Sequence, residues 1–167
     1  MKDFEEIYQT YQSDVWRFLL CLTGYDRLTA EELTQETFYQ AFLSLSRYRG
    51  ACQLRTWLFQ IARNVYGKYV RRETKQRQMN TFEAETRMHS DMVQDAERKE
   101  QLLHLREAIA QLEEPAKSVV EYRLYSELSY AEIAGILNIR EGTASVMFNR
   151  AKVKICSYLK EVYGYEI

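Results

Sequence analysis

The chain has 167 residues, of which 46% are hydrophobic and 28% charged, a balance that fits one or two folded domains and excludes a wholly disordered chain. With one proline and six glycines, it has little of the turn chemistry that a many-stranded sheet requires, so we expect an all-α fold. The net charge of −1 excludes a uniformly basic protein and leaves local charged patches to be examined.

Apolar runs in this chain are only a few residues long, whereas a membrane-spanning helix needs roughly 20, so we expect no membrane insertion. The N-terminus lacks the basic-then-apolar order of a secretion signal, and the three cysteines, Cys21, Cys52 and Cys156, are odd in number and far apart. Both features predict a cytoplasmic protein. The two histidines have no partners at metal-ligand spacing, so we expect neither a metal nor another cofactor.

Three amphipathic helices are predicted in residues 1–75, because apolar residues recur there at steps of three and four. The first covers residues 4–22 and ends at Gly24. The second follows a Thr29–Glu32 capping box and is expected to bury Leu33, Phe38, Ala41, Phe42 and Leu45. The third is expected to bury Leu54, Trp57, Leu58, Ile61, Ala62, Val65 and Tyr69, and to turn Thr56, Gln60, Arg63, Asn64 and Arg71 outward. Together these helices predict one small bundle.

Residues 76–100 contain few apolar residues and no stable period, which predicts a flexible linker, partly helical or ordered only by a partner. A second helical domain is predicted over residues 101–167, where the helical period resumes at Leu102 and Pro115 marks another helix start. A Ser129–Glu132 capping box opens a short helix that Asn138 ends in a left-handed turn. The last helix spans residues 142–158, so the segment forms a helix-turn-helix.

The helix after this turn carries polar or extended side chains that can reach base edges and phosphates from within a major groove. These side chains are Glu141, Thr143, Ser145, Met147, Asn149 and Arg150. A helical hairpin with a basic end also occurs in proteins that bind no DNA, so this segment alone supports only a hypothesis of DNA binding.

Charge is distributed unevenly along the chain. Residues 47–75 contain eight basic residues and one acid, a local balance of +7, whereas residues 26–36 contain four acids and one arginine. An ordinary solvated helix face mixes both signs. Cations beside aromatic rings are typical of surfaces that bind single-stranded nucleic acid, where Tyr48 is the best stacking candidate because Trp57 and Tyr69 are expected in the core.

Three motifs together resemble the bacterial extracytoplasmic-function sigma factors. The sequences EELTQETF at 31–38, WLFQIARN at 57–64 and RR at 71–72 are similar to sigma region two. The sequences LSYAEIA at 128–134 and GT at 142–143 through RA at 150–151 are similar to region four. Motif order, spacing and chain length all agree with the family.

The resemblance implies a dissociable promoter-specificity subunit of RNA polymerase, with no catalysis of its own. Core polymerase would bind the acidic second helix through Glu32, Leu33, Gln35, Glu36 and Phe38. The minus-ten element would be recognised and opened by Tyr48, Arg49, Gly50, Gln60, Arg63, Asn64, Lys68, Arg71 and Arg72. The minus-thirty-five element would contact Arg140, Glu141, Thr143, Ser145, Met147, Asn149, Arg150 and Lys152. The linker would thread toward the polymerase channels, and an anti-sigma factor would be a further partner.

The chain departs from the family pattern on its recognition helix. Ser145 and Met147 stand where relatives commonly carry lysine and arginine, and Arg140 stands where they often have a serine cap. Binding to the upstream element is therefore expected to be weak, unusually specific or dependent on polymerase contacts.

Three other classes of protein compete with this interpretation. A free-standing helix-turn-helix regulator would explain residues 102–160 but not the acidic and basic helices before them. An adaptor would explain the heptad-like residues 102–112 and little else. An enzyme is least favoured, because the sequence has no visible nucleophile and base pair, phosphate loop or metal cluster.

Overall fold

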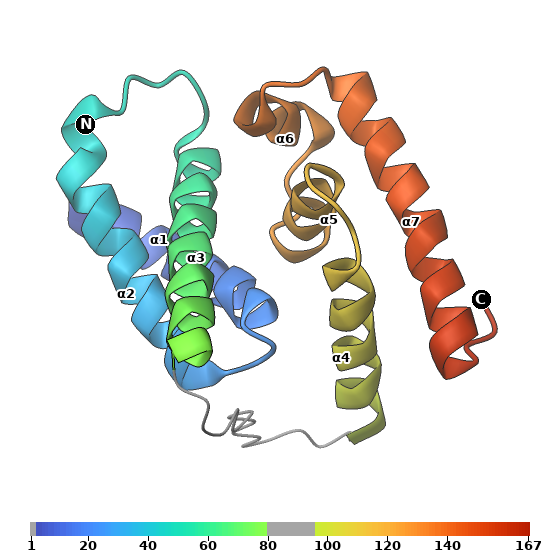
Figure 1. Ribbon diagram of the computed structural model, residues 1–167. Coiled ribbons are helices and arrows are strands. Elements are labelled where there is room, and N and C mark those ends of the chain that lie inside the picture. The colour runs from blue at the N-terminus through green and yellow to red at the C-terminus, as the bar shows by residue number, and fades with distance from the viewer. Residues whose placement is uncertain (1–2, 80–95) are drawn as a thin grey trace. The chain divides into compact units, whose positions relative to one another are not determined.

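The computed structural model describes residues 3–79 and 96–167, and all regular structure in these residues is helical (Figure 1). The chain divides into two units, Met1–Ser90 and Asp91–Ile167. The predicted all-α class with two helical domains is thus confirmed. The segment expected as a linker is helical at both ends, because α3 continues to Met79 and α4 begins at Ala96, and its middle lies outside the described residues.

Unit 1 is a bundle of three helices, α1 (Phe4–Leu22), α2 (Arg27–Ser44) and α3 (Leu54–Met79), each packed against the other two. A short 3-10 helix, η1 (Leu45–Arg47), follows α2. Phe18 and Phe59 meet edge to face at the centre, with ring centroids 5.2 Å apart, and both are fully buried. The buried apolar residues of α1 and α3 also include Val15, Leu19, Leu58 and Ala62.

The start of α2 differs from the predicted capping box. Asp26, and not Thr29, is the N-cap: its carboxylate accepts from the Thr29 backbone N–H at 3.2 Å and from the Thr29 hydroxyl at 2.7 Å. The helix therefore begins at Arg27. The prediction was wrong because Asp26 caps the helix three residues earlier, which places Thr29 inside the first turn, and the aspartate charge favours a helix N-terminus.

Two further side chains lie on the opposite side from the one predicted. Phe42 was expected in the core, but 59% of it is exposed and only one edge of its ring meets Phe4, at 5.2 Å between centroids. Thr56 was expected to point outward, but it is 2% exposed. A threonine is small enough to be buried on a helix, and on α2 it is Phe38, 3% exposed, that packs inward against α1.

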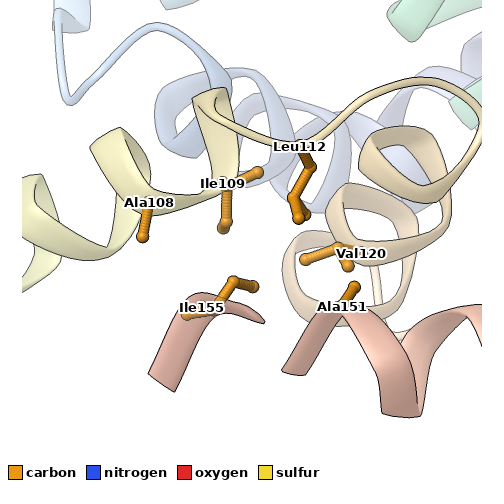
Figure 2. Close-up of a cluster of buried hydrophobic side chains, with 6 residues drawn as sticks. All are labelled: Ala108, Ile109, Leu112, Val120, Ala151 and Ile155. Atoms are coloured by element: carbon orange, nitrogen blue, oxygen red, sulfur yellow. The ribbon is translucent and has the colours of Figure 1, made fainter. Parts of the chain in front are cut away.

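Unit 2 contains α4 (Ala96–Ala110), α5 (Ala116–Tyr125), α6 (Tyr130–Leu137) and α7 (Glu141–Tyr163), and α7 packs against each of the other three. Figure 2 shows how the core of this unit closes, with α7 side chains directed at α4, the α4–α5 connection and α5. The buried cluster consists of Ala108, Ile109, Leu112, Val120, Ala151 and Ile155.

The turn between α6 and α7 has the predicted geometry. The Ser129 hydroxyl accepts from the Glu132 backbone N–H, and the Glu132 carboxylate accepts from the Ser129 N–H, so the capping box is confirmed. Asn138 ends α6 in the left-handed region at φ 55°, as expected. Arg140 precedes α7 without a side-chain cap, in line with the missing serine. None of the described helices is long and apolar enough to span a bilayer.

Candidate functional site

The basic surface of unit 1 lies along the outward side of α3. Asn64, Lys68, Arg71 and Lys75 are all exposed and recur at steps of three and four, so they line one face of the helix. Arg72 is exposed beside them. We call these five residues the α3 basic face. Arg47 at the end of η1 and Arg49 in the loop before α3 are exposed as well. Six of the eight cations in residues 47–75 therefore lie at the surface.

An aromatic pair stands at the N-terminal end of this face. The rings of Tyr48 and Trp57 lie 5.0 Å apart at a tilt of 38°, and both residues are half-buried. The Tyr48 hydroxyl donates to the Cys52 carbonyl, which closes the loop over Gly50, whose φ of +73° suits a residue without Cβ. Burial raises the pKa of the Tyr48 phenol, so the ring stays neutral at physiological pH. The pair therefore offers a fixed, uncharged stacking surface beside the cations.

Two of the predicted minus-ten residues lie off the centre of the basic face. Gln60 is half-buried, one turn before Asn64 on the same side of α3. Arg63 is also half-buried, its Nε is shielded from solvent, and its position on the helix places it away from Asn64 and Lys68. The structure thus groups Tyr48, Arg49 and Gly50 with the basic face and leaves Arg63 at its margin.

The outward side of α2 combines acidic, amide and apolar residues. Glu32, Gln35 and Glu36 are exposed and lie on one side of the helix, and Glu36 accepts a hydrogen bond from Gln40 at 2.8 Å. Large apolar residues more than half exposed share this side: Leu28, Tyr39, Phe42 and Leu43. We call these seven residues the α2 face. A groove of about 440 Å³ between α1 and α2, lined in part by Trp16 and Gln35, adjoins it.

Leu33 and Phe38, which were predicted to bind polymerase directly, do not lie on this surface. They are 4% and 3% exposed, because they fall on the side of α2 that packs in the bundle. The Phe38 ring meets Tyr8 edge to face at 4.9 Å between centroids. The prediction of direct contact is corrected: these two residues fix α2 against the bundle.

The outward side of α7 is less basic than that of α3. Arg140, Glu141, Thr143, Asn149, Arg150 and Lys152 are exposed, whereas Ser145 and Met147 are half-buried at its edges. Ring contacts join α5, α6 and this helix, because the Arg123 guanidinium of α5 lies 4.5 Å from the centroid of the Tyr130 ring at the start of α6, and Tyr130 meets Phe148 of α7 at 6.0 Å. Unit 2 therefore presents the N-terminal half of α7 on a braced helix-turn-helix.

Sequence reasoning missed several surface residues. Trp57 was assigned to the core, yet it stands seven residues before Asn64 and so on the outward side of α3. Tyr39 and Leu43 follow Gln35 and Glu36 at helical spacing, and this spacing was a signal that could have revealed them. Val146, 48% exposed, is central on α7.

Comparison with protein families agrees with the division into two units. The Sigma-70 region 2 model matches residues 7–76, and the Sigma-70 region 4 model matches residues 102–155. The first match contains both the α2 face and the α3 basic face, and the second contains the helix-turn-helix.

Individual relatives cover nearly the whole chain. The ECF RNA polymerase sigma factor SigM of Bacillus subtilis is 31% identical over 90% of this chain and 91% of its own, and the RNA polymerase sigma factor YlaC of the same species is 29% identical over 90% and 88%. The fold resembles that of the sigma factor RpoE of Bartonella quintana, solved with the anti-sigma factor NepR, at TM-score 0.70, 22% identity and coverage of 96% and 98%. The chain belongs to the extracytoplasmic-function sigma factors, which direct RNA polymerase to promoters.

Proposed function

We propose that the three surfaces divide the work of initiation: the α2 face binds core RNA polymerase, the α3 basic face with the Tyr48–Trp57 pair opens the minus-ten element, and α7 holds the minus-thirty-five element. One observation carries this proposal. Within a single small bundle, α2 exposes three acids against one cation, Arg27, whereas α3 exposes five cations and no acid, so one protein partner and one nucleic acid can bind at the same time.

The α2 face has the composition of a protein-binding surface. Tyr39, Phe42 and Leu43 supply exposed apolar area, which stabilises a complex when it is buried, while Glu32 and Glu36 select a basic partner. DNA is a poor partner for this surface, because the carboxylates would repel its phosphates. Core polymerase is therefore assigned to α2.

The α3 basic face and the aromatic pair have the two elements that strand opening requires. Lys68, Arg71 and Arg72 neutralise phosphates of the non-template strand, and this contribution does not depend on base sequence. An extruded base costs a few kcal/mol of unstacking, which the neighbouring Tyr48 and Trp57 rings offset by stacking. Asn64 offers an amide that can donate to and accept from a base edge.

The helix-turn-helix presents α7 to the duplex upstream. Recognition helices of this type contact base edges mainly through their N-terminal residues, which here include Thr143 and Asn149 on the exposed side. Arg150 and Lys152 follow and are placed to reach phosphates. A free-standing regulator would need only this unit and would leave the α2 face and the α3 basic face without a partner.

We also propose an anti-sigma factor as a partner, and no chemical step catalysed by this chain. The anti-sigma proposal is supported by two proteins of similar fold that were solved as complexes: RpoE with the anti-sigma factor NepR, and CnrH with the cytosolic domain of CnrY, the second at TM-score 0.65 and 17% identity. The exposed apolar residues of α2 provide a surface that such a partner can cover.

Transcription in a reconstituted system tests the proposal. The chain is mixed with core polymerase and a library of genomic fragments, and run-off transcripts are sequenced. Initiation that depends on the chain and shares two sequence elements upstream of the start sites is the expected result. Tight binding of duplex DNA by the chain alone, without any effect on core polymerase, would instead indicate a free-standing regulator.

A further inference from the structure

An apolar side chain lies at the centre of the DNA-facing side of α7. Val146 is 48% exposed, whereas Ala144 and Ala151, on the opposite side of the helix, are 0% and 2% exposed. Its neighbours on the outward side, Asn149 and Arg150, are both exposed. Val146 is thus not part of the core of unit 2, and it is surrounded by polar residues and cations.

The preceding turn leaves the Val146 methyl groups uncovered. Side chains on a helix tilt toward its N-terminus, so Val146 lies over the turn that contains Gly142. Gly142 has no side chain, it is exposed, and a Cβ built there meets nothing within 4 Å. Packing therefore does not require glycine at this position, and position 142 contributes no side chain that could cover Val146.

The charge around Val146 selects a nucleic acid as its partner. Residues 140–154 contain four exposed cations, Arg140, Arg150, Lys152 and Lys154, against the single acid Glu141. A phosphate backbone on either side of Val146 would satisfy these cations. The 5-methyl group of thymine is the apolar feature that base pairs display in the major groove.

We propose that Val146 contacts the 5-methyl group of a thymine in the upstream promoter element and thereby helps to determine which promoters are used. The inference rests on the proposed placement of α7 in the major groove. Val146 is the sixth residue of α7, within the N-terminal part of a recognition helix that contacts base edges. Val153, 66% exposed and seven residues further on, lies beyond that part.

Deoxyuridine tests the contact, because it pairs as thymine does and lacks only the methyl group. Holoenzyme formed from core polymerase and the full chain is assayed on a duplex promoter taken from the genomic library. Each thymine of the upstream element is replaced in turn. One such replacement is expected to reduce initiation at limiting holoenzyme about fourfold, because this is the change in affinity that corresponds to burying one methyl-sized group.

Two variants complete the experiment. Val146→Ala should initiate about fourfold less on the thymine promoter and should not respond further to deoxyuridine at the sensitive position. Val153→Ala makes the same chemical change at another exposed position and should keep the full response. Melting curves of both variants should match wild type, because neither side chain is buried.

The possible outcomes separate this inference from the function on which it rests. Wild-type holoenzyme that initiates at no promoter would overturn the proposed function and this inference with it. Normal initiation that ignores deoxyuridine at every thymine, or an upstream element without thymine on either strand, overturns the inference alone. So does a Val146→Ala variant that keeps the wild-type response.

Discussion

The α3 basic face and the outward side of α7 both present cations, but they differ in the residues between those cations. On α3 the companions of Lys68 and Arg71 are the rings of Tyr48 and Trp57, flat surfaces suited to unpaired bases. On α7 the companions of Arg150 are aliphatic or small, chiefly Val146 and Thr143, which suit the floor of a groove. In the proposed function, the same charge thus serves single strands in one unit and duplex in the other.

The largest expected effect concerns the α2 face, because in the proposed function neither the α3 basic face nor α7 acts without polymerase. Replacing Gln35 with alanine and Glu36 with lysine together should weaken core binding more than tenfold, since both side chains are exposed at the centre of the α2 face and the lysine reverses its charge. Affinity is measured by titrating labelled chain with core polymerase, and thermal melting should remain close to wild type.

A matched control is available on α1. Gln9 and Glu5 are also exposed, and Gln9 donates to Glu5 at 3.0 Å, much as Gln40 donates to Glu36. The variant with Gln9→Ala and Glu5→Lys makes the same chemical changes on α1, outside the seven residues of the α2 face, and should bind core polymerase normally. If the two double variants bound core polymerase with equal affinity, the proposal that the α2 face binds polymerase would be wrong.

The second prediction examines strand opening on the α3 basic face. Arg71→Ala and Asn64→Ala should each leave core binding intact and reduce run-off transcription from a duplex promoter about fivefold, within the range of roughly 1–3 kcal/mol for one base or strand contact. A pre-melted bubble template should restore part of the loss at Arg71. Because both residues are exposed, their variants should retain stability within about 0.5 kcal/mol.

The control for this prediction is Arg17→Ala on α1, which removes an exposed arginine whose partner is Asp14 at 2.6 Å. It should transcribe normally. If Arg71→Ala and Asn64→Ala also transcribed the duplex promoter normally, strand opening would have to be assigned to the loop that carries Tyr48.

The contrast between the two capping boxes shows how far the sequence determines the fold. Both Thr29–Glu32 and Ser129–Glu132 fit the same pattern, and the second forms as predicted. The first fails because Asp26 caps the helix three residues earlier and so places Thr29 inside its first turn. The local sequence pattern therefore predicts that a helix starts nearby. Which residue is the N-cap depends on which side-chain oxygen of the preceding turn lies within hydrogen-bond distance of the first backbone N–H groups.

The site was predicted less completely, for a reason of geometry. Periodicity separates the two sides of a helix, but residues at the boundary, such as Trp57 and Phe42, can fall on either side. Packing decides them: Phe38 takes the inward place beside Tyr8 while Phe42 stays 59% exposed, and Trp57 remains at the surface against Tyr48. The motifs identified the acidic and basic helices correctly, and only the structure separated their surface residues from their buried supports.

The third prediction tests the difference between the two DNA-facing sides directly. The slope of log binding constant against log salt concentration is about −0.9 for each phosphate of a duplex that is neutralised. Substituting Arg150 and Lys152 with alanine should therefore make this slope shallower by about 1.8 for duplex and should barely change binding to a single strand. Substituting Arg71 and Arg72 should do the reverse, with a reduction of about 1.4 for a single strand. Fluorescence anisotropy over a salt series measures both.

Each double variant is the control for the other, since both remove two exposed cations from the same net charge. The chain alone should bind duplex weakly, because Ser145 and Met147 supply no charge on α7. Identical losses on both kinds of DNA would mean that the two sides act as one diffuse basic surface.

The smallest expected effect concerns a contact within unit 2, between α4 and the end of α7. Tyr163, at the end of α7, donates to Glu107 of α4 and stacks on His104 with ring centroids 3.6 Å apart. The hydrogen bond to Glu107 raises the pKa of the Tyr163 phenol to about 12. Because a protonated phenol is neutral and the folded state holds this proton more tightly than the unfolded chain, the contribution to stability is complete below about pH 10. It is lost as the pH rises from there through about 12.

Tyr163→Phe removes the hydroxyl and should therefore be less stable than wild type by a constant amount up to about pH 10, with the difference shrinking toward pH 12. Urea unfolding across this range, compared between variants, cancels the titration of groups that all of them share. Tyr165→Phe is the matched control, since its hydroxyl lies 2.9 Å from His104 Nδ1 instead of a carboxylate, and it should keep the wild-type decline. A stability difference between Tyr163→Phe and wild type that stays constant to pH 12 would show that Glu107 does not hold this proton.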